Sequence, residues 1–216
     1  FVNGGKKIKA TLIDRIQDRY GKTIYRHDGR VCNDCDAPRW TGQTEPVLID
    51  NREQVIDTMT AYQMTSILEG VVIRGTGAAI KEVGKPLAGK TGTTNDAKDV
   101  WFVGFSPDLA VGVYLGYDRP RSMGSHAQAA QYSAPIFRDF MMQALKDKPD
   151  TPFRVPPGIK LVSVDPHSGL RSSGAGAILE AFKPGTAPPD ASGAFDPGKM
   201  MDAASGTPPG GGGGLY

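Results

Sequence analysis

The run Leu87-Ala88-Gly89-Lys90-Thr91-Gly92-Thr93-Thr94-Asn95-Asp96 is the most informative part of this sequence. It is rich in β-branched threonine and closes on an Asn-Asp pair, which favours an extended strand that ends in a turn. Glycines on both sides of Lys90 leave little side-chain cover, so another backbone or a ligand can come close to the strand. We therefore expect Lys90 to lie on a strand with room beside it.

The segments after this run predict an antiparallel sheet. Apolar runs at residues 100–105 and 109–117, joined by a Ser-Pro-Asp turn, predict a hairpin, and their near-continuous hydrophobicity predicts cover on both faces. The Lys90 strand would be the third, outer strand of a meander. A helix capped by Ser133, with Pro135 in its first turn, can cover the sheet. Its expected buried stripe is Ile136, Phe137, Phe140, Met141, Ala144 and Leu145.

A long buried helix is expected before the Lys90 strand. Apolar residues recur at helical spacing from about residue 56 to 72, and Asp50 and Asn51, with acidic and amide residues three positions on, resemble a capping box. The helix should end near residues 70–77. Met59 and Met64 could form a promiscuous binding face, but methionines at helical spacing more often belong to a core.

The remaining segments predict two small hairpins and a tail. Alternation on either side of a Tyr-Gly-Lys turn predicts a hairpin over residues 10–27, and residues 26–50 read as a polar surface excursion. A second hairpin is expected over residues 160–171, around a Pro-His-Ser-Gly turn. We therefore expect a main domain over residues 1–148, an extended segment with the small hairpin over residues 149–190, and a Gly/Pro-rich disordered tail over residues 191–216.

Composition limits the possible functions. The 216 residues carry a formal charge of +2, too small an excess to imply nucleic acid or a membrane surface as partner. There is no signal peptide and no apolar span long enough to cross a bilayer, and the start at Phe1 without Met suggests a piece of a longer protein. His126 and His167 lie in polar, Gly-flanked stretches and read as solvated loop residues.

Cys32 and Cys35 form a lone pair whose role the sequence leaves open. The spacing fits a local disulfide or structural thiols, half of a metal site, or a redox pair. His27 is the only nearby histidine, so four zinc ligands cannot be assembled from visible residues. We expect no metal and no cofactor.

Two functions compete for the Lys90 peptide. Residues 84–91 fit the phosphate-loop pattern G-x-x-x-x-G-K-[ST], and Asp118 at the end of an apolar strand could hold magnesium. A phosphate loop, however, needs a helix that opens at Lys90 and Thr91, so that backbone N–H groups point at the phosphates. No helix fits before the aromatic strand at Val100, so we reject the nucleotide interpretation.

The alternative is that Lys90-Thr91-Gly92 is the lysine-threonine-glycine box of penicillin-recognising serine enzymes. A lysine on an edge strand supplies positive charge beside a nucleophile, and a glycine makes room for a peptide to lie antiparallel to the strand. Threonine hydroxyls can bind a carboxylate. Over about residues 1–148 the chain resembles the bifunctional, class A penicillin-binding proteins, especially the 1A type, with a weaker echo at residues 182–186. The resemblance rests on residues 1–5, 70–77, 87–96, 98–108, 112–118 and 134–140.

The resemblance implies an incomplete α+β domain, with an antiparallel sheet covered by helices, from a peptidoglycan synthase at the periplasmic face of the inner membrane. Such an enzyme cross-links stem peptides through a serine acyl-enzyme and binds β-lactams. It implies catalytic roles for Lys90, Thr91 and Gly92 and substrate binding by Thr93 and Thr94, with the Thr93 backbone N–H as an oxyanion-hole donor.

The 216 residues depart from that family in one decisive respect. No serine has lysine three residues on and none has asparagine two residues on, so the nucleophile box and the second box are both absent. Ser106, Ser122 and Ser133 are the alternative nucleophiles of a triad-like arrangement, but Ser106 is expected to be a turn residue and Ser133 a helix cap, so we do not assign catalysis to them. We expect the chain to be inactive alone and to need an upstream half, which would also carry the membrane anchor. The alternatives are a non-catalytic periplasmic interaction module, or a β-lactamase or D,D-carboxypeptidase relative.

Overall fold

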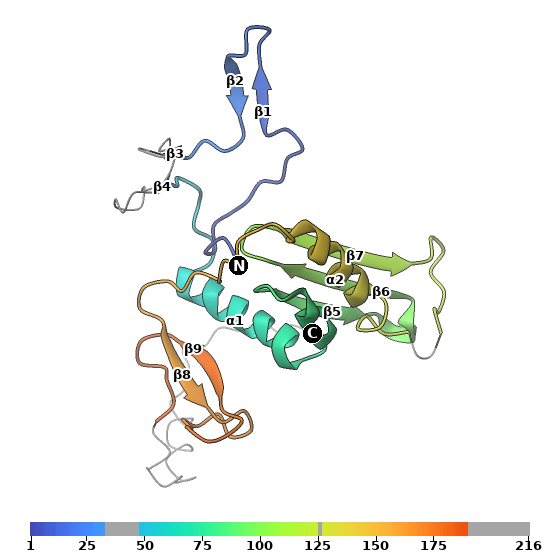
Figure 1. The fold of residues 1–216 in the computed structure, drawn as a ribbon, viewed down its shortest axis with the longest axis vertical. Coiled ribbons are helices and arrows are strands. Elements are labelled where there is room, and N and C mark those ends of the chain that lie inside the picture. Colours follow the sequence, from blue (N-terminus) through green and yellow to red (C-terminus); the bar gives the residue numbers. More distant parts are fainter. Residues whose placement is uncertain (33–47, 125–126, 190–216) are drawn as a thin grey trace, which may run out of the picture. The chain divides into compact units, whose positions relative to one another are not determined.

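The computed structural model describes residues 1–32, 48–124 and 127–189 (Figure 1). The chain divides into two compact units, Phe1–Pro157 and Gly158–Tyr216, and the second is described as far as residue 189. The predicted tail at 191–216 lies outside the described residues, as do Cys35 and His126. The part of the chain that the structure describes holds no helix long and apolar enough to cross a membrane.

The centre of the first unit is a three-stranded antiparallel sheet in the order β5-β6-β7 (Figure 1). It consists of β5 (Ala88–Thr93), β6 (Asp99–Phe105) and β7 (Ala110–Gly116). The predicted meander with the Lys90 strand at its edge is therefore confirmed. Only η2 (Asn95–Ala97), a single 3-10 turn, lies between β5 and β6, so β5 leads into no phosphate-loop helix.

Helix α2 (Ser133–Ala144) covers one face of this sheet, as Figure 1 shows. The rings of Phe102 on β6 and Phe137 on α2 lie 4.7 Å apart, centroid to centroid, and both side chains are fully buried. Leu87, directly before β5, and residues of η1 (Ala78–Val83) complete this core. Its buried members are Val72, Ile80, Leu87, Phe102, Ala134, Phe137, Met141 and Leu145.

The other face of the sheet is open within the described residues. Trp101, Val103 and Tyr114 are 43%, 53% and 51% exposed, so the expectation of cover on both faces is wrong for this part of the chain. Burial alternates along β6 because, within the described residues, the core that contains Phe102 and Phe137 lies on one face of the sheet. Ile136 and Phe140 are also about half exposed, so the predicted stripe of α2 is narrower than expected.

The expected cap of α2 is also wrong by one residue. The N-cap is Tyr132, which makes no side-chain capping bond. Ser133 is the first helical residue, and its Oγ donates to the carbonyl of Ala129 at 3.0 Å. Its buried hydroxyl thus ties the helix back to the preceding turn.

Helix α1 (Thr58–Arg74) ends where expected but begins later than the capping pattern at Asp50 predicted. The reason is the segment before it: the N–H groups of Val55 and Ile56 both donate to the carbonyl of Gly5, so this segment is bonded to the start of the chain instead of entering the helix. Gly5 has φ +82°, and a Cβ there would lie 2.1 Å from the Ile56 carbonyl oxygen. Asp57 is the N-cap instead, accepting from the Thr60 N–H at 2.9 Å.

One side of α1 is more exposed than a buried helix would be. Met59 and Met64 are half-buried, and Ile67 is 53% exposed, whereas Ala61, Thr65, Gly70 and Val72 are buried. The helix therefore buries one face within the described residues.

The predicted hairpin over residues 10–27 is present but shorter, with β1 (Arg15–Gln17) paired to β2 (Thr23–Arg26). Beyond it, β3 (Val31–Cys32) and β4 (Leu48–Ile49) form a two-residue ladder. The structure does not describe the side chain of Cys32, and the question about the two cysteines lies outside the described residues.

In the second unit, β8 (Lys160–Val164) pairs with β9 (Ile178–Phe182). The predicted strand at 160–165 and the turn after it are present, but the predicted pairing with residues 170–171 reduces to one bridge, Val164 to Arg171. The sequence reading missed β9. Its five-residue ladder with β8 spans a longer loop. Asp165 holds the turn directly after β8, accepting from the N–H groups of His167 and Ser168.

Candidate active-site strand

The hydrogen-bond pattern of β5 shows which backbone groups its edge exposes. Thr94 N donates to Asp99 O at 3.1 Å, and the ladder continues from this pair in the same register. Because hydrogen-bonded pairs alternate in an antiparallel ladder, residues 90 and 92 bond inward to β6. Thr91 and Thr93 therefore direct their backbone N–H and C=O groups away from β6, toward the sheet edge, which can accept an added strand.

Lys90 lies on the open face of the sheet. It stands opposite Val103 on β6, and residues directly opposite each other share a face. Its side chain is exposed and turns to the strand edge, where Nζ donates to Thr91 O at 2.9 Å and to Thr91 Oγ1 at 3.2 Å. The exposed ammonium group is thus held at the edge of β5 by its bonds to Thr91.

Thr91 has a further partner that the sequence analysis did not single out. Its Oγ1 lies 2.9 Å from Oγ1 of Thr76, which follows the C-terminus of α1. The contact joins α1 to β5 beside Lys90. The signal that could have found it is the Gly-Thr-Gly sequence at residues 75–77, at the end of a predicted helix.

The two glycines of β5 meet different surroundings. A Cβ on Gly89 would lie 2.6 Å from Phe102 Cζ and 2.9 Å from Gly104 Cα, so packing excludes any side chain there. A Cβ on Gly92 would meet only Trp101 Cβ, at 3.4 Å, which is an ordinary contact. Packing within the described residues therefore explains Gly89 and does not explain Gly92.

Thr93 and Thr94 are held by local bonds. Thr93 Oγ1 accepts from the Ala129 N–H at 3.2 Å and keeps its own proton available. Thr94 Oγ1 donates to Asp99 O at 3.2 Å and accepts from Asp99 N at 3.0 Å. The Thr94 hydroxyl therefore shapes the turn between β5 and β6.

The serines considered as alternative nucleophiles have local partners. Ser106 is buried and its Oγ accepts from Leu109 N at 3.1 Å, inside the β6–β7 turn. Ser122 Oγ accepts from Gly124 N at 3.2 Å. With Ser133 bonded to Ala129, all three hydroxyls serve the backbone. The described residues hold no group of three His, Cys, Asp or Glu side chains that could bind a metal ion.

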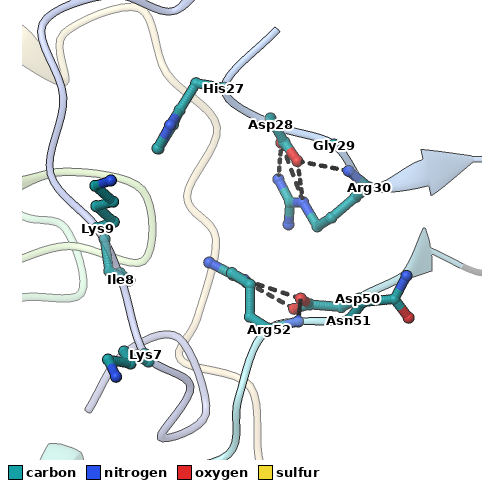
Figure 2. A pocket seen from close by; sticks show the side chains of 10 residues that line it. All are labelled: Lys7, Ile8, Lys9, His27, Asp28, Gly29, Arg30, Asp50, Asn51 and Arg52. Atoms are coloured by element: carbon teal, nitrogen blue, oxygen red, sulfur yellow. Dashed lines mark hydrogen bonds and ion pairs between the residues drawn. The ribbon is translucent and has the colours of Figure 1, made fainter.

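A separate cavity of about 430 Å³ lies near the β3–β4 ladder (Figure 2). Two Asp-x-Arg turns frame it, and each arginine forks onto the aspartate two residues before it, Arg30 onto Asp28 and Arg52 onto Asp50. These hydrogen bonds hold the pKa of both carboxyl groups well below the usual range. The guanidinium charges are therefore largely compensated, which weakens the cavity as an anion site. It is lined by Lys7, Ile8, Lys9, His27, Asp28, Gly29, Arg30, Asp50, Asn51 and Arg52.

Comparison with known proteins identifies the family. Residues 1–142 match the family model for the penicillin binding protein transpeptidase domain. The chain belongs to this family. The resemblance to the 1A type is confirmed as well: the chain is 47% identical over 185 residues to penicillin-binding protein 1A of Rickettsia conorii, which covers 85% of the chain and 23% of that relative. Penicillin-binding protein 1A of Pseudomonas aeruginosa is 34% identical over 246 residues, covering 96% of the chain and 30% of the relative.

The fold comparison agrees. The crystal structure of penicillin-binding protein 1A from Haemophilus influenzae matches this transpeptidase-family chain with a TM-score of 0.69 and 31% identity, over 87% of the chain and 31% of that structure. The penicillin-binding α+β fold predicted from the sequence is confirmed. The chain spans about a quarter of the length of the curated relatives it matches first, 23% for the Rickettsia conorii protein.

Proposed function

We propose that this chain forms one wall of the active site of a peptidoglycan D,D-transpeptidase, the activity of a bifunctional synthase at the periplasmic face of the bacterial inner membrane. The proposal rests on the outer edge of β5, which pairs with no other strand within the described residues. The backbone N–H and C=O groups of Thr91 and Thr93 point to this edge, and the Lys90 ammonium group is held there by Thr91. An edge of this kind can pair with an extended peptide in the manner of an added strand. The donor would be a stem peptide ending in D-alanyl-D-alanine.

In this proposal each residue of β5 has a role. The Lys90 ammonium supports proton transfer at the nucleophile and attracts the substrate carboxylate. Thr91 and Thr93 donate hydroxyl hydrogens to that carboxylate, and the Thr93 N–H, which points to the edge, donates to the oxyanion. Gly92 keeps the groove free of a side chain. Thr94 enters the proposal as the residue that fixes the turn after the strand, because both of its hydroxyl functions are used there.

The nucleophile would be a serine in a Ser-x-x-Lys box, which none of the 216 residues supplies. We propose that the segment carrying it packs on the open face of the sheet, where Lys90 stands beside exposed Trp101 and Val103. Its serine attacks the carbonyl carbon of the terminal peptide bond, D-alanine leaves, and the acyl group passes to an amine on a neighbouring strand. A β-lactam acylates the same serine.

Labelling with a fluorescent penicillin tests the proposal. The purified 216-residue chain should take up no covalent label, whereas the protein that contains both this chain and a Ser-x-x-Lys box should be labelled on that serine. In the second protein, Lys90→Ala should slow labelling by more than about tenfold. A label on the isolated chain would refute the claim that these 216 residues lack the nucleophile. An unlabelled complete protein would refute the transpeptidase assignment.

One observation favours a second function, binding without catalysis. The β1–β2 hairpin exposes apolar side chains to solvent, with Ile16, Ile24 and Tyr25 42%, 64% and 45% exposed. Such a surface suits a protein partner. Intact mass and N-terminal sequencing of the native gene product separate the two: a Ser-x-x-Lys box upstream in the same reading frame supports the enzyme, and its absence supports the binding module.

A further inference from the structure

Thr76 is held against β5 by the glycines on either side of it. A Cβ on Gly75 would lie 2.9 Å from Val71 Cα, and a Cβ on Gly77 would lie 3.3 Å from the Val71 carbonyl oxygen. The N–H groups of both glycines donate to that same carbonyl, at 3.1 and 3.0 Å. The chain therefore turns sharply after α1, and the exposed side chain of Thr76 is fixed at the level of Thr91.

Counting hydrogens shows what this contact leaves available. Two threonine hydroxyls carry two protons, and the 2.9 Å bond between Thr76 and Thr91 uses one of them in either direction. Lys90 Nζ can only donate, and it occupies an acceptor site on Thr91 Oγ1. One hydroxyl proton remains for an outside acceptor. Of the three ammonium protons of Lys90, two are used on Thr91 O and Oγ1, so one remains there as well.

The atoms that carry the two remaining donors are close together, because Thr91 Oγ1 lies 3.2 Å from Lys90 Nζ and 2.9 Å from Thr76 Oγ1. A planar carboxylate accepts two such hydrogen bonds, and the positive charge of Lys90 strengthens both. A neutral ester or amide in the same place would lose the charge-assisted part. The arrangement is therefore suited to a ligand carboxylate next to the strand.

We propose that Thr76 donates its hydroxyl hydrogen to Thr91 and is thereby a positioning residue of the carboxylate site, holding the Thr91 hydroxyl and its proton in the direction of the substrate. The inference rests on the proposed function, because it concerns the same ligand. It adds to the lysine-threonine-glycine strand a residue from the end of α1, 15 positions earlier in the chain. Removal of its hydroxyl would free Thr91 to turn toward another partner, so recognition of the carboxylate would weaken.

Acylation rates measured with two related ligands test the inference. The protein that contains this chain and a Ser-x-x-Lys box is treated with benzylpenicillin and with its methyl ester, which lacks the carboxylate. Thr76→Val should slow acylation by benzylpenicillin by about tenfold and leave the rate with the ester unchanged, because a hydrogen bond to a charged group is worth about that factor. Thr76→Ser, which keeps the hydroxyl, should restore the wild-type ratio of the two rates.

Thr60→Val is the matched control. Its hydroxyl donates to Asp57 at 2.9 Å, at the opposite end of α1, so this variant also removes a hydroxyl group that forms a hydrogen bond at an end of the helix. It should leave the ratio of the two rates unchanged. Thermal unfolding of each variant shows whether a rate change follows from a loss of stability.

The outcomes separate the inference from the function it rests on. Equal slowing with both ligands in Thr76→Val, accompanied by a lower melting temperature, means that Thr76 only ties α1 to β5 and overturns the inference. An unchanged rate with both ligands also overturns it. If the wild-type protein is not acylated by either ligand, the transpeptidase assignment fails, and the positioning role of Thr76 fails with it.

Discussion

Alanine at the two glycines of β5 should have opposite consequences. In Gly89→Ala the new Cβ would lie 2.6 and 2.8 Å from Phe102 Cζ and Cε1, and 2.9 Å from Gly104 Cα. Phe102 cannot turn aside, because it is fully buried and packs on Phe137. Overpacking of this kind costs about 1–3 kcal/mol, and the reduced freedom of the unfolded chain returns about 0.4–1 kcal/mol. We expect a net loss of about 1–2 kcal/mol.

Gly92→Ala should not destabilise the fold. Its Cβ meets only Trp101 Cβ, at 3.4 Å, so the expected change in stability is between zero and a gain of about 0.5 kcal/mol. If a substrate strand lies along the edge of β5, however, the added methyl group would stand in the groove. Acylation of the complete, serine-containing protein by penicillin should then slow by about tenfold or more, a loss that corresponds to about 1.4 kcal/mol.

Thermal unfolding of the 216-residue chain, monitored by far-ultraviolet circular dichroism, measures the change in stability caused by each substitution. For a chain of this size, Gly89→Ala should lower the melting temperature by roughly 2–8 °C, with Gly92→Ala within about 2 °C of the wild type. Equal destabilisation by both variants would refute the packing distinction. A Gly92→Ala protein that is stable and is acylated at the wild-type rate would refute the idea that the substrate lies beside Gly92 along the edge of β5.

Two further predictions concern stability. Burial raises the pKa of Glu69 on α1, and Arg74 opposes this with a smaller effect. The folded state therefore binds the Glu69 proton more tightly than the unfolded state does. The stability gained from this proton is present at low pH and is lost as the pH rises through the raised pKa. Glu69→Gln should accordingly raise the melting temperature more at pH 7 than at pH 4, and an equal shift at both would disprove it. Phe137→Ala should cost about 3–5 kcal/mol and Phe140→Ala, half exposed on the same helix, under about 1 kcal/mol; similar losses in urea denaturation would show that α2 packs differently.

The fold was predictable where the sequence pattern and the neighbouring backbone agree. The meander of β5, β6 and β7 follows from two apolar runs and a turn, since consecutive strands usually lie next to each other in a sheet. The start of α1 was not predictable in the same way, because the capping pattern at Asp50 competes with hydrogen bonds to Gly5, which is 45 residues away in the chain. Likewise β9 is paired across a loop whose length no local signal fixes.

For the candidate site as well, some features follow from the local sequence and others depend on tertiary contacts. The sequence by itself determined the lysine-threonine-glycine box, its place on an edge strand, and the absence of a Ser-x-x-Lys box from these 216 residues, because each is a matter of local order along the chain. Only the tertiary structure decided that Thr76 meets Thr91, that Phe102 occupies the space beside Gly89, and that Gly92 has room for a Cβ in ordinary contact with Trp101. These facts depend on which side chains distant segments bring together, and packing rather than local propensity sets that.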